Sequence, residues 1–192
     1  MFVQIFLFIL DSVCGFLTLA LLVRFAMQWA RAPFRNPLGQ FIVAVTDWMV
    51  RPVRRLIPGL FGLDMASLLL AWFWQVVYQG TALGFSGVLS AVSPAPTFVV
   101  ALLALLEVAK TSLYLVIGAV IVSAVFSWVN PYAPLAEVFN TLTRPLLRPF
   151  RRIIPPVGGV DLSPLALLLV LQIGLFVIAG LRNSVMPLIL MS

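Results

Sequence analysis

The sequence predicts an all-α membrane protein made of two tandem repeats. Each repeat has two transmembrane helices joined by an amphipathic interfacial helix and an arginine- and proline-rich motif. The first reason is composition: 62% of the 192 residues are hydrophobic and 9% are charged, with a mean hydropathy of +1.14. A soluble domain carries about 25% charged residues, so this chain has too few to suit a water-exposed surface. The second reason is that one basic motif occurs twice.

The duplicated motif reads R-P-x-R-R-[L/I]-I-P-x-x-x-G-x-D. It runs from Arg51 to Asp64 and returns 97 positions later, from Arg148, with 8 of 14 positions identical in the two copies. The offset is about half of the chain. It therefore predicts two repeats, residues 1–93 and residues 94–192.

Four apolar runs are long enough to cross a bilayer, for which about 20 residues are needed. In the first repeat they cover about residues 2–29 and 65–88, and in the second about residues 98–129 and 165–181. The third run is longer than the hydrocarbon core requires. Either it tilts, or its beginning, residues 98–106, lies at the membrane surface.

A shorter helix is expected before each basic motif. From Leu38 to Val50, apolar residues recur at helical spacing, which predicts a helix with one apolar face. This segment of 13 residues is too short to span, so we expect it to lie in the interface plane. Pro52 suits the first turn of a further short helix, which Pro58 ends. The second repeat has the same apolar pattern.

The basic residues predict the orientation in the membrane. Ten of the 12 lie between the first and second spans or between the third and fourth, when Arg24 at the border of the first span is counted. The positive-inside rule then places both connections in the cytoplasm and both termini outside. In so apolar a chain, basic residues typically bind anionic lipid headgroups, and we expect no nucleic-acid partner.

Composition also argues against an enzyme. The chain has no histidine and a single cysteine, Cys14, which excludes intrachain disulfides, His/Cys metal sites and catalytic histidines. No nucleophile–base pair and no glycine-rich phosphate loop is visible in the sequence. We therefore expect no catalytic residue, no metal and no cofactor.

The candidate binding residues are the arginines of the two motifs. Their spacing is the same in both copies, which indicates a defined shape that presents them to a lipid headgroup or to a membrane protein partner. Membrane anchoring by charge alone is the alternative. The aspartates that close the motifs, Asp64 and Asp161, are predicted N-caps of the second and fourth spans. The arginines are Arg51, Arg54, Arg55, Arg148, Arg151 and Arg152.

Five polar residues within the predicted spans are further candidates. Gln75 and Gln172 occupy equivalent positions and are expected to hydrogen-bond between the repeats, or else to serve a ligand or a permeation path. Asp11 and Lys110 are also equivalent. They either pair with each other or remain solvated near the outer interface, and Glu107 is placed to neutralise Lys110 at i,i+3.

Two further segments accompany the motifs: Asn36-Pro37-Leu38 and Ser127-Trp128. With both R-P-x-R-R-x-I-P segments, they make the chain resemble the YggT family of small bacterial and plastid membrane proteins over essentially its whole length. The resemblance implies a multi-pass protein of the bacterial inner, or plasma, membrane. It also implies loose associations with osmotic stress or potassium uptake, with cell division or nucleoid organisation, and, in plastid relatives, with maturation of a membrane cytochrome. This chain lacks histidine and a cysteine pair, so it has no usual haem ligands.

We expect a non-enzymatic scaffold or assembly factor that binds anionic lipid through the two arginine motifs, together with a membrane protein partner or a second copy of the chain. The alternative is an oligomeric transporter or channel component linked to osmotic stress or potassium uptake. Its support is limited to the polar residues within the spans. Four spans are few for a pore in one chain, so the alternative requires an oligomer.

Overall fold

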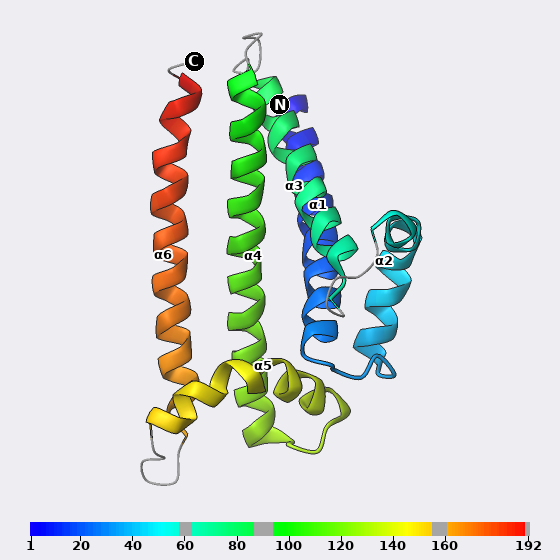
Figure 1. Ribbon diagram of the computed structural model, residues 1–192, viewed down its shortest axis with the longest axis vertical. Coiled ribbons are helices and arrows are strands. Elements are labelled where there is room, and N and C mark those ends of the chain that lie inside the picture. Colours follow the sequence, from blue (N-terminus) through cyan, green and yellow to red (C-terminus); the bar gives the residue numbers. More distant parts are fainter. Residues whose placement is uncertain (58–62, 87–93, 155–160, 191–192) are drawn as a thin grey trace.

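A computed structural model of the protein describes residues 1–57, 63–86, 94–154 and 161–190, and these residues form six helices. In Figure 1, α4 and α6 stand antiparallel and side by side, and α1 and α3 form a tilted pair next to α4. Both termini lie at one end of the bundle, and α5 crosses the opposite end. The helices are α1 (Phe2–Trp29), α2 (Pro37–Leu56), α3 (Met65–Phe85), α4 (Pro94–Val129), α5 (Pro134–Ile153) and α6 (Ser163–Leu190).

Three of the four predicted spans are confirmed as helices long and apolar enough to cross a membrane. Within the described part of the chain these are Phe2–Trp29, Thr97–Val129 and Ser163–Val185. α3 is not among them, because two tryptophans and two glutamines lower its mean hydropathy. The crossing of residues 65–88 therefore stays a prediction. Residues 98–106 lie within the continuous helix α4, which is straight in Figure 1, so they do not form a separate helix. The alternative that they lie at the membrane surface stays a prediction.

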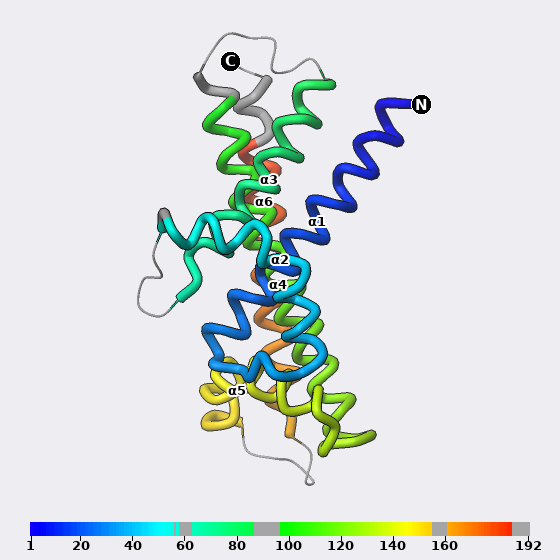
Figure 2. The backbone as a smooth tube through the Cα atoms, turned by 90° about the vertical axis from the view of Figure 1, so that its right-hand side faces the viewer, coloured from blue at the N-terminus to red at the C-terminus, as the bar shows by residue number. Residues whose placement is uncertain are grey.

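α2 and α5 are each a single helix of 20 residues, so the prediction of a separate short helix beginning at Pro52 is wrong. Pro52 lies inside α2, and Pro145 and Pro149 lie inside α5. A proline removes one backbone hydrogen bond and bends a helix, and packing on both sides keeps the helix continuous. Figures 1 and 2 show that α2 turns in its second half. Pro58 lies outside the described residues.

The two connecting helices do not take equivalent places in the bundle. The first part of α2 runs back along α1 and its last part lies beside the middle of the bundle, whereas α5 crosses the end (Figure 1, Figure 2). The two copies of the basic motif therefore lie in different parts of the bundle. Polar contacts account for this difference in position. Arg24 and Asp47 form an ion pair that joins α1 to α2, whereas Ser123 and Arg144 occupy the corresponding positions in the second half.

The buried side chains form separate groups, one of which positions the candidate site. Leu21 and Val50 belong to a group that joins α1, α2, α3 and α4. Met27 and Val138 belong to a second group, which joins the end of α1 to α5. A third group joins α4, α5 and α6. The second group brings residues 29–31, which follow Met27 closely, against α5.

Candidate functional site

In the first half, a buried arginine joins three elements. Arg24 of α1 is 6% exposed. Its Nη1 donates to Thr46 Oγ1 at 2.7 Å and its Nη2 to Asp47 Oδ1 at 2.9 Å, both on α2. Its Nε lies 3.4 Å from Asp64 Oδ2, at the start of α3. A buried charge is tolerated only when it is paired and hydrogen-bonded, and here both conditions are met.

Asp64 is the second centre of this group. It is the N-cap of α3, as predicted, and accepts from the Ser67 backbone N–H at 3.4 Å and from Ser67 Oγ at 2.7 Å. Its oxygens also accept from Arg54 Nε at 3.1 Å and Nη2 at 2.5 Å. Burial by itself raises the pKa of the Asp64 carboxyl, but the bonds from Arg54 and Ser67 and the charge of Arg24 outweigh it, so this pKa is lowered. The bond to Asp64 raises the pKa of Arg54.

Asp47 neutralises one more motif arginine. Arg51 Nε lies 2.7 Å from Asp47 Oδ2, one turn away on α2. We call Arg24, Asp47, Arg51, Arg54 and Asp64 the first-half network. Two of the three candidate arginines in this motif are therefore paired, and their contacts indicate a structural role in holding α2 and α3 on α1. The third, Arg55, is exposed and has no carboxylate partner among the residues described.

The first-half network predicts loss of stability in acid. Burial alone raises the pKa of Asp47, but Arg24 and Arg51 outweigh it, so the pKa of Asp47, like that of Asp64, is below its ordinary value of 3.8. The stabilisation is therefore full above the ordinary pKa and is lost as the pH falls through the folded values. Thermal unfolding in detergent from about pH 7 to about pH 2.5 measures this loss. The double variant Asp47→Asn with Asp64→Asn is expected to flatten the profile, and an unchanged slope would contradict the assignment.

The second half keeps one ion pair of the first half and loses the others. Arg151 Nε lies 2.8 Å from Asp161 Oδ2, the counterpart of Arg54 with Asp64, but these side chains are 53% and 41% exposed. Asp161 was predicted to be the N-cap of this helix, but it lies two residues before α6, one position outside the N-cap. It still accepts from the Ser163 N–H at 2.9 Å and so stabilises the first turn. Burial raises the pKa of Asp161, yet the bonds from Ser163 and Arg151 leave it lowered.

Asp47 and the buried arginine of the first half have no counterparts here. Ser123 stands where α1 has Arg24, and its Oγ donates to Asn140 Oδ1 at 2.6 Å. Arg144 stands where α2 has Asp47, so a negative charge is replaced by a positive one. The motif arginines of α5 are therefore surrounded by fewer carboxylates than those of α2.

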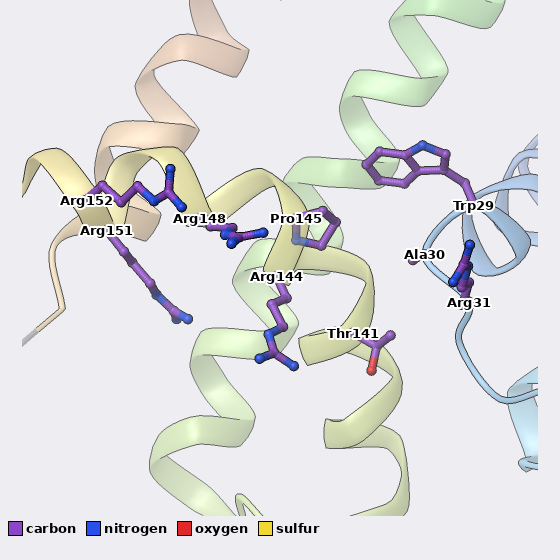
Figure 3. A pocket seen from close by; sticks show the side chains of 9 residues that line it. All are labelled: Trp29, Ala30, Arg31, Thr141, Arg144, Pro145, Arg148, Arg151 and Arg152. Carbon is purple, nitrogen blue, oxygen red and sulfur yellow. The ribbon is translucent and has the colours of Figure 1, made fainter.

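A cavity of about 790 Å³ lies between α5 and the end of α1. In Figure 3 the arginines of α5 lie on one side of it, and Trp29 and Arg31 lie on the other. Arg151 has Asp161 as a partner, while the other four arginines have no carboxylate partner in the part of the chain described. We call this cavity the arginine cleft. It is lined by Trp29, Ala30, Arg31, Thr141, Arg144, Pro145, Arg148, Arg151 and Arg152.

Arg31 is held in an unusual backbone conformation at the edge of the arginine cleft. Its φ of 55° lies in the left-handed region. Its N–H donates to Gln28 O at 3.1 Å and the next N–H, of Ala32, donates to Met27 O at 2.8 Å, which closes α1 in a Schellman motif. Glycine is the usual residue at this place, and another residue costs about 1–2 kcal/mol. An arginine is thus kept where backbone energetics favour glycine.

Neither Arg31 nor Arg144 was among the candidate residues predicted from the sequence. For Arg144 a signal was available: at the 97-residue offset it replaces Asp47, an inversion of charge between the copies. For Arg31 no signal was available, because a left-handed conformation at a residue other than glycine is not readable from the residue type.

Comparison with known proteins agrees with this duplicated architecture. The profile of the CCB3/YggT family matches residues 3–84 and again residues 102–182. The chain belongs to the CCB3/YggT family. The tandem YggT repeats predicted from the sequence are consistent with these two matches, one in each half.

Relatives of this YggT protein come from several bacteria. The protein PA0392 of Pseudomonas aeruginosa is 41% identical over 171 residues, which are 87% of this chain and 84% of the relative. YggT of Escherichia coli is 37% identical over 170 residues, 86% of this chain and 85% of the relative. A Vibrio alginolyticus protein named for the proC 3′ region is 33% identical over 179 residues, 93% and 95% of the two chains. All three are named as uncharacterised, so no enzymatic activity is indicated. No solved structure matches.

The two predicted glutamine partners are not brought together in this YggT protein. Gln75 of α3 is 4% exposed, and its Nε2 donates to Thr18 Oγ1 on α1 at 3.1 Å. Its Oε1 has no hydrogen-bond partner among the described residues, and Gln172 is exposed on α6. The predicted bond between the repeats is therefore wrong. Gln75 instead joins α1 to α3 within the first half, and a ligand or permeation role for the two amides stays a prediction.

The charged candidates in the spans form a different set of pairs. Lys110 Nζ lies 2.5 Å from Glu107 Oε1, so the predicted neutralisation at i,i+3 is confirmed. Arg182 of α6 lies 3.3 Å from the other oxygen of Glu107, a contact between α4 and α6 that the sequence analysis missed. Asp11 is exposed on α1 and interacts with Tyr78 of α3. The predicted alternative of an Asp11–Lys110 pair is therefore wrong.

Proposed function

We propose that this YggT-family protein is a non-enzymatic membrane scaffold or assembly factor, and that it binds anionic groups at the membrane surface through the arginine cleft. One observation carries the proposal. Arg31, Arg144, Arg148 and Arg152 line one cavity, and none of them has a carboxylate partner among the described residues. Gathering like charges without counterions is unfavourable, and an anionic ligand would relieve it.

The residue types suit this ligand class. A guanidinium presents a planar fork of donors that matches the oxygens of a phosphate, and it stays charged at all physiological pH values. Arginines beside a membrane gain about 1 kcal/mol each from anionic lipid. Trp29 at the edge of the arginine cleft is of the type enriched where a membrane meets water. On α5, Val138, Leu142 and Leu147 are buried, while Arg144 and Arg148 are exposed.

The proposal includes an orientation in the inner membrane. Both termini lie at the end of the bundle opposite α5 (Figure 1), which agrees with termini outside and the arginine cleft in the cytoplasm. This orientation requires that α3 crosses the membrane as the fourth span. Its length of 21 residues is sufficient for that. In the first half, by contrast, the motif acts mainly in folding, because Asp47 and Asp64 occupy its arginines.

Photo-crosslinking in cells tests the proposal without removing any arginine. A photoreactive residue replaces Thr141, which lines the arginine cleft, or Ala44, which is the equivalent exposed position of α2. We expect position 141 to capture anionic phospholipid in excess over its share of the membrane, and to capture an identified membrane protein that is lost with Arg144→Gln and Arg148→Gln. Equal capture at positions 44 and 141, or no anionic enrichment at 141, would refute a binding role for the arginine cleft.

A further inference from the structure

An apolar cavity adjoins the arginine cleft and shares Trp29 with it. This cavity, which we call the slot, has a volume of about 330 Å³ and lies between α1, α4 and α5, where the two halves of the chain meet. Phe25 and Trp29 come from α1, Leu115 and Ala119 from α4, and Leu146 from α5. A cavity of this kind is favourable for an apolar occupant.

The polar side chains in the slot do not offer donors to a ligand. Ser112 Oγ donates to the Val108 carbonyl of its own helix at 2.8 Å. Thr143 Oγ1 donates to the Phe139 carbonyl at 2.9 Å. Because both hydroxyl protons are used within the helices, the slot selects by shape and apolar contact. This excludes a polar small molecule as a well-matched occupant.

The slot and the arginine cleft lie on different faces of α5 and meet at Trp29, which lines both. Thr141, Arg144 and Arg148 line the cleft, while Leu142 and Leu146, the neighbours of these residues in sequence, line the slot. A ligand that extends past Trp29 from one face of α5 to the other would therefore meet guanidinium groups at one end and apolar side chains at the other. Such a ligand is an amphiphile with an anionic head.

We propose that the arginine cleft and the slot together bind one anionic phospholipid, with its phosphate on the cleft arginines and part of one acyl chain in the slot. This inference rests on the proposed function and names its ligand class. A water molecule takes about 30 Å³ in the liquid, so the slot accommodates roughly eleven groups of that size, which is a segment of a single chain. The second acyl chain lies in the surrounding bilayer.

The position of the slot gives the lipid a structural consequence. α1 belongs to the first half and α4 and α5 to the second, so an acyl chain in the slot contacts both halves. The lipid therefore joins the repeats at the end of the bundle where the arginine cleft lies. Any ligand that binds only the folded state raises its stability by mass action.

Native mass spectrometry of the full chain in detergent tests this inference. The probes are phosphatidylglycerol and phosphatidylcholine with the same long acyl chains, and inorganic phosphate. We expect one phosphatidylglycerol to bind per chain, with an affinity at least about tenfold higher than that of phosphatidylcholine. Inorganic phosphate at equal concentration is expected not to displace it. Full displacement by phosphate would identify a site for free anions and overturn the lipid assignment.

Slot variants separate this inference from the proposed function. Ala119→Phe and Ser112→Phe place a ring in the slot and leave every arginine in place. We expect each to lower phosphatidylglycerol retention at least about tenfold, while crosslinking from position 141 to anionic lipid persists. Leu169→Phe, on the exposed face of α6, is the matched control and is expected to have no effect. Helix content and thermal unfolding without lipid verify folding. In the opposite outcome, the arginine variants lose phosphatidylglycerol retention while both slot variants keep it unchanged. That result would overturn binding of an acyl chain in the slot and leave the proposed function standing.

Discussion

Replacing Arg24 by methionine is expected to lower the free energy of unfolding by about 3 kcal/mol, the scale for breaking a buried ion pair from one side. The substitution leaves Asp64, whose side chain is 1% exposed, with Arg54 as its remaining ion-pair partner among the described residues. It also removes the bonds to Thr46 and Asp47 that hold α2 against α1. Reversible unfolding of the detergent-solubilised protein measures the loss.

Arg55→Met is the matched control for this prediction. Arg55 is exposed and outside the first-half network, so its substitution is expected to change stability by less than about 0.5 kcal/mol. Ser123→Ala, at the position equivalent to Arg24, removes one neutral hydrogen bond and is expected to cost about 1 kcal/mol. If Arg24→Met cost no more than Ser123→Ala, the first-half network would not be what distinguishes the two halves.

The triple substitution of Arg144, Arg148 and Arg152 by glutamine is expected to weaken binding of an anionic phospholipid about 100-fold. The estimate takes about 1 kcal/mol for each arginine and about 1.4 kcal/mol for each factor of ten. Titration of a fluorescent phosphatidylglycerol into the protein in neutral detergent measures the dissociation constant. Unfolding is expected to change little, because these side chains are exposed and have no ion pair among the described residues.

Two comparisons make the binding result specific. Arg51→Gln with Arg55→Gln is expected to weaken binding no more than about fivefold, because Asp47 already neutralises Arg51. Arg31→Gly also removes one cleft arginine but introduces the residue that a φ of 55° favours. We expect it to weaken lipid binding about fivefold while raising stability by about 1 kcal/mol. Equal losses from the α2 and α5 variants would show that charge alone, without the arginine cleft, determines binding.

Several features of the fold were predictable because their causes are local. Long apolar runs in the sequence predict helices, and the three confirmed spans are such helices. The N-cap role of Asp64 follows from an acidic residue just before an apolar run, and the Glu107–Lys110 pair follows from helical spacing. Each of these depends on residues within one turn of each other. A motif repeated with its spacing intact also identifies a duplication without any knowledge of contacts.

The predictions that were wrong depend on contacts distant in the sequence. Arg24 meets Asp64 across 40 positions, and Glu107 meets Arg182 across 75. Pro52 does not divide α2, because Val50 and Val53, on either side of the proline, both pack in the group that joins α2 to α1 and α3. A hydrogen bond between Gln75 and Gln172 was expected to join the repeats, but Gln75 donates to Thr18 within the first repeat. Residue type gives the donors and acceptors, but distance decides which of them meet.

The sequence by itself determined that this protein is helical, apolar enough for a membrane, duplicated, and basic where its spans connect. These properties follow from composition, periodicity and repetition, which need no tertiary contacts. Only the tertiary structure decided that the two copies of the motif have different surroundings. In the first half, carboxylates brought from α2 and from the start of α3 occupy the arginines. In the second, an arginine replaces one carboxylate and the end of α1 packs against α5, so the same residue types line an open, basic cavity.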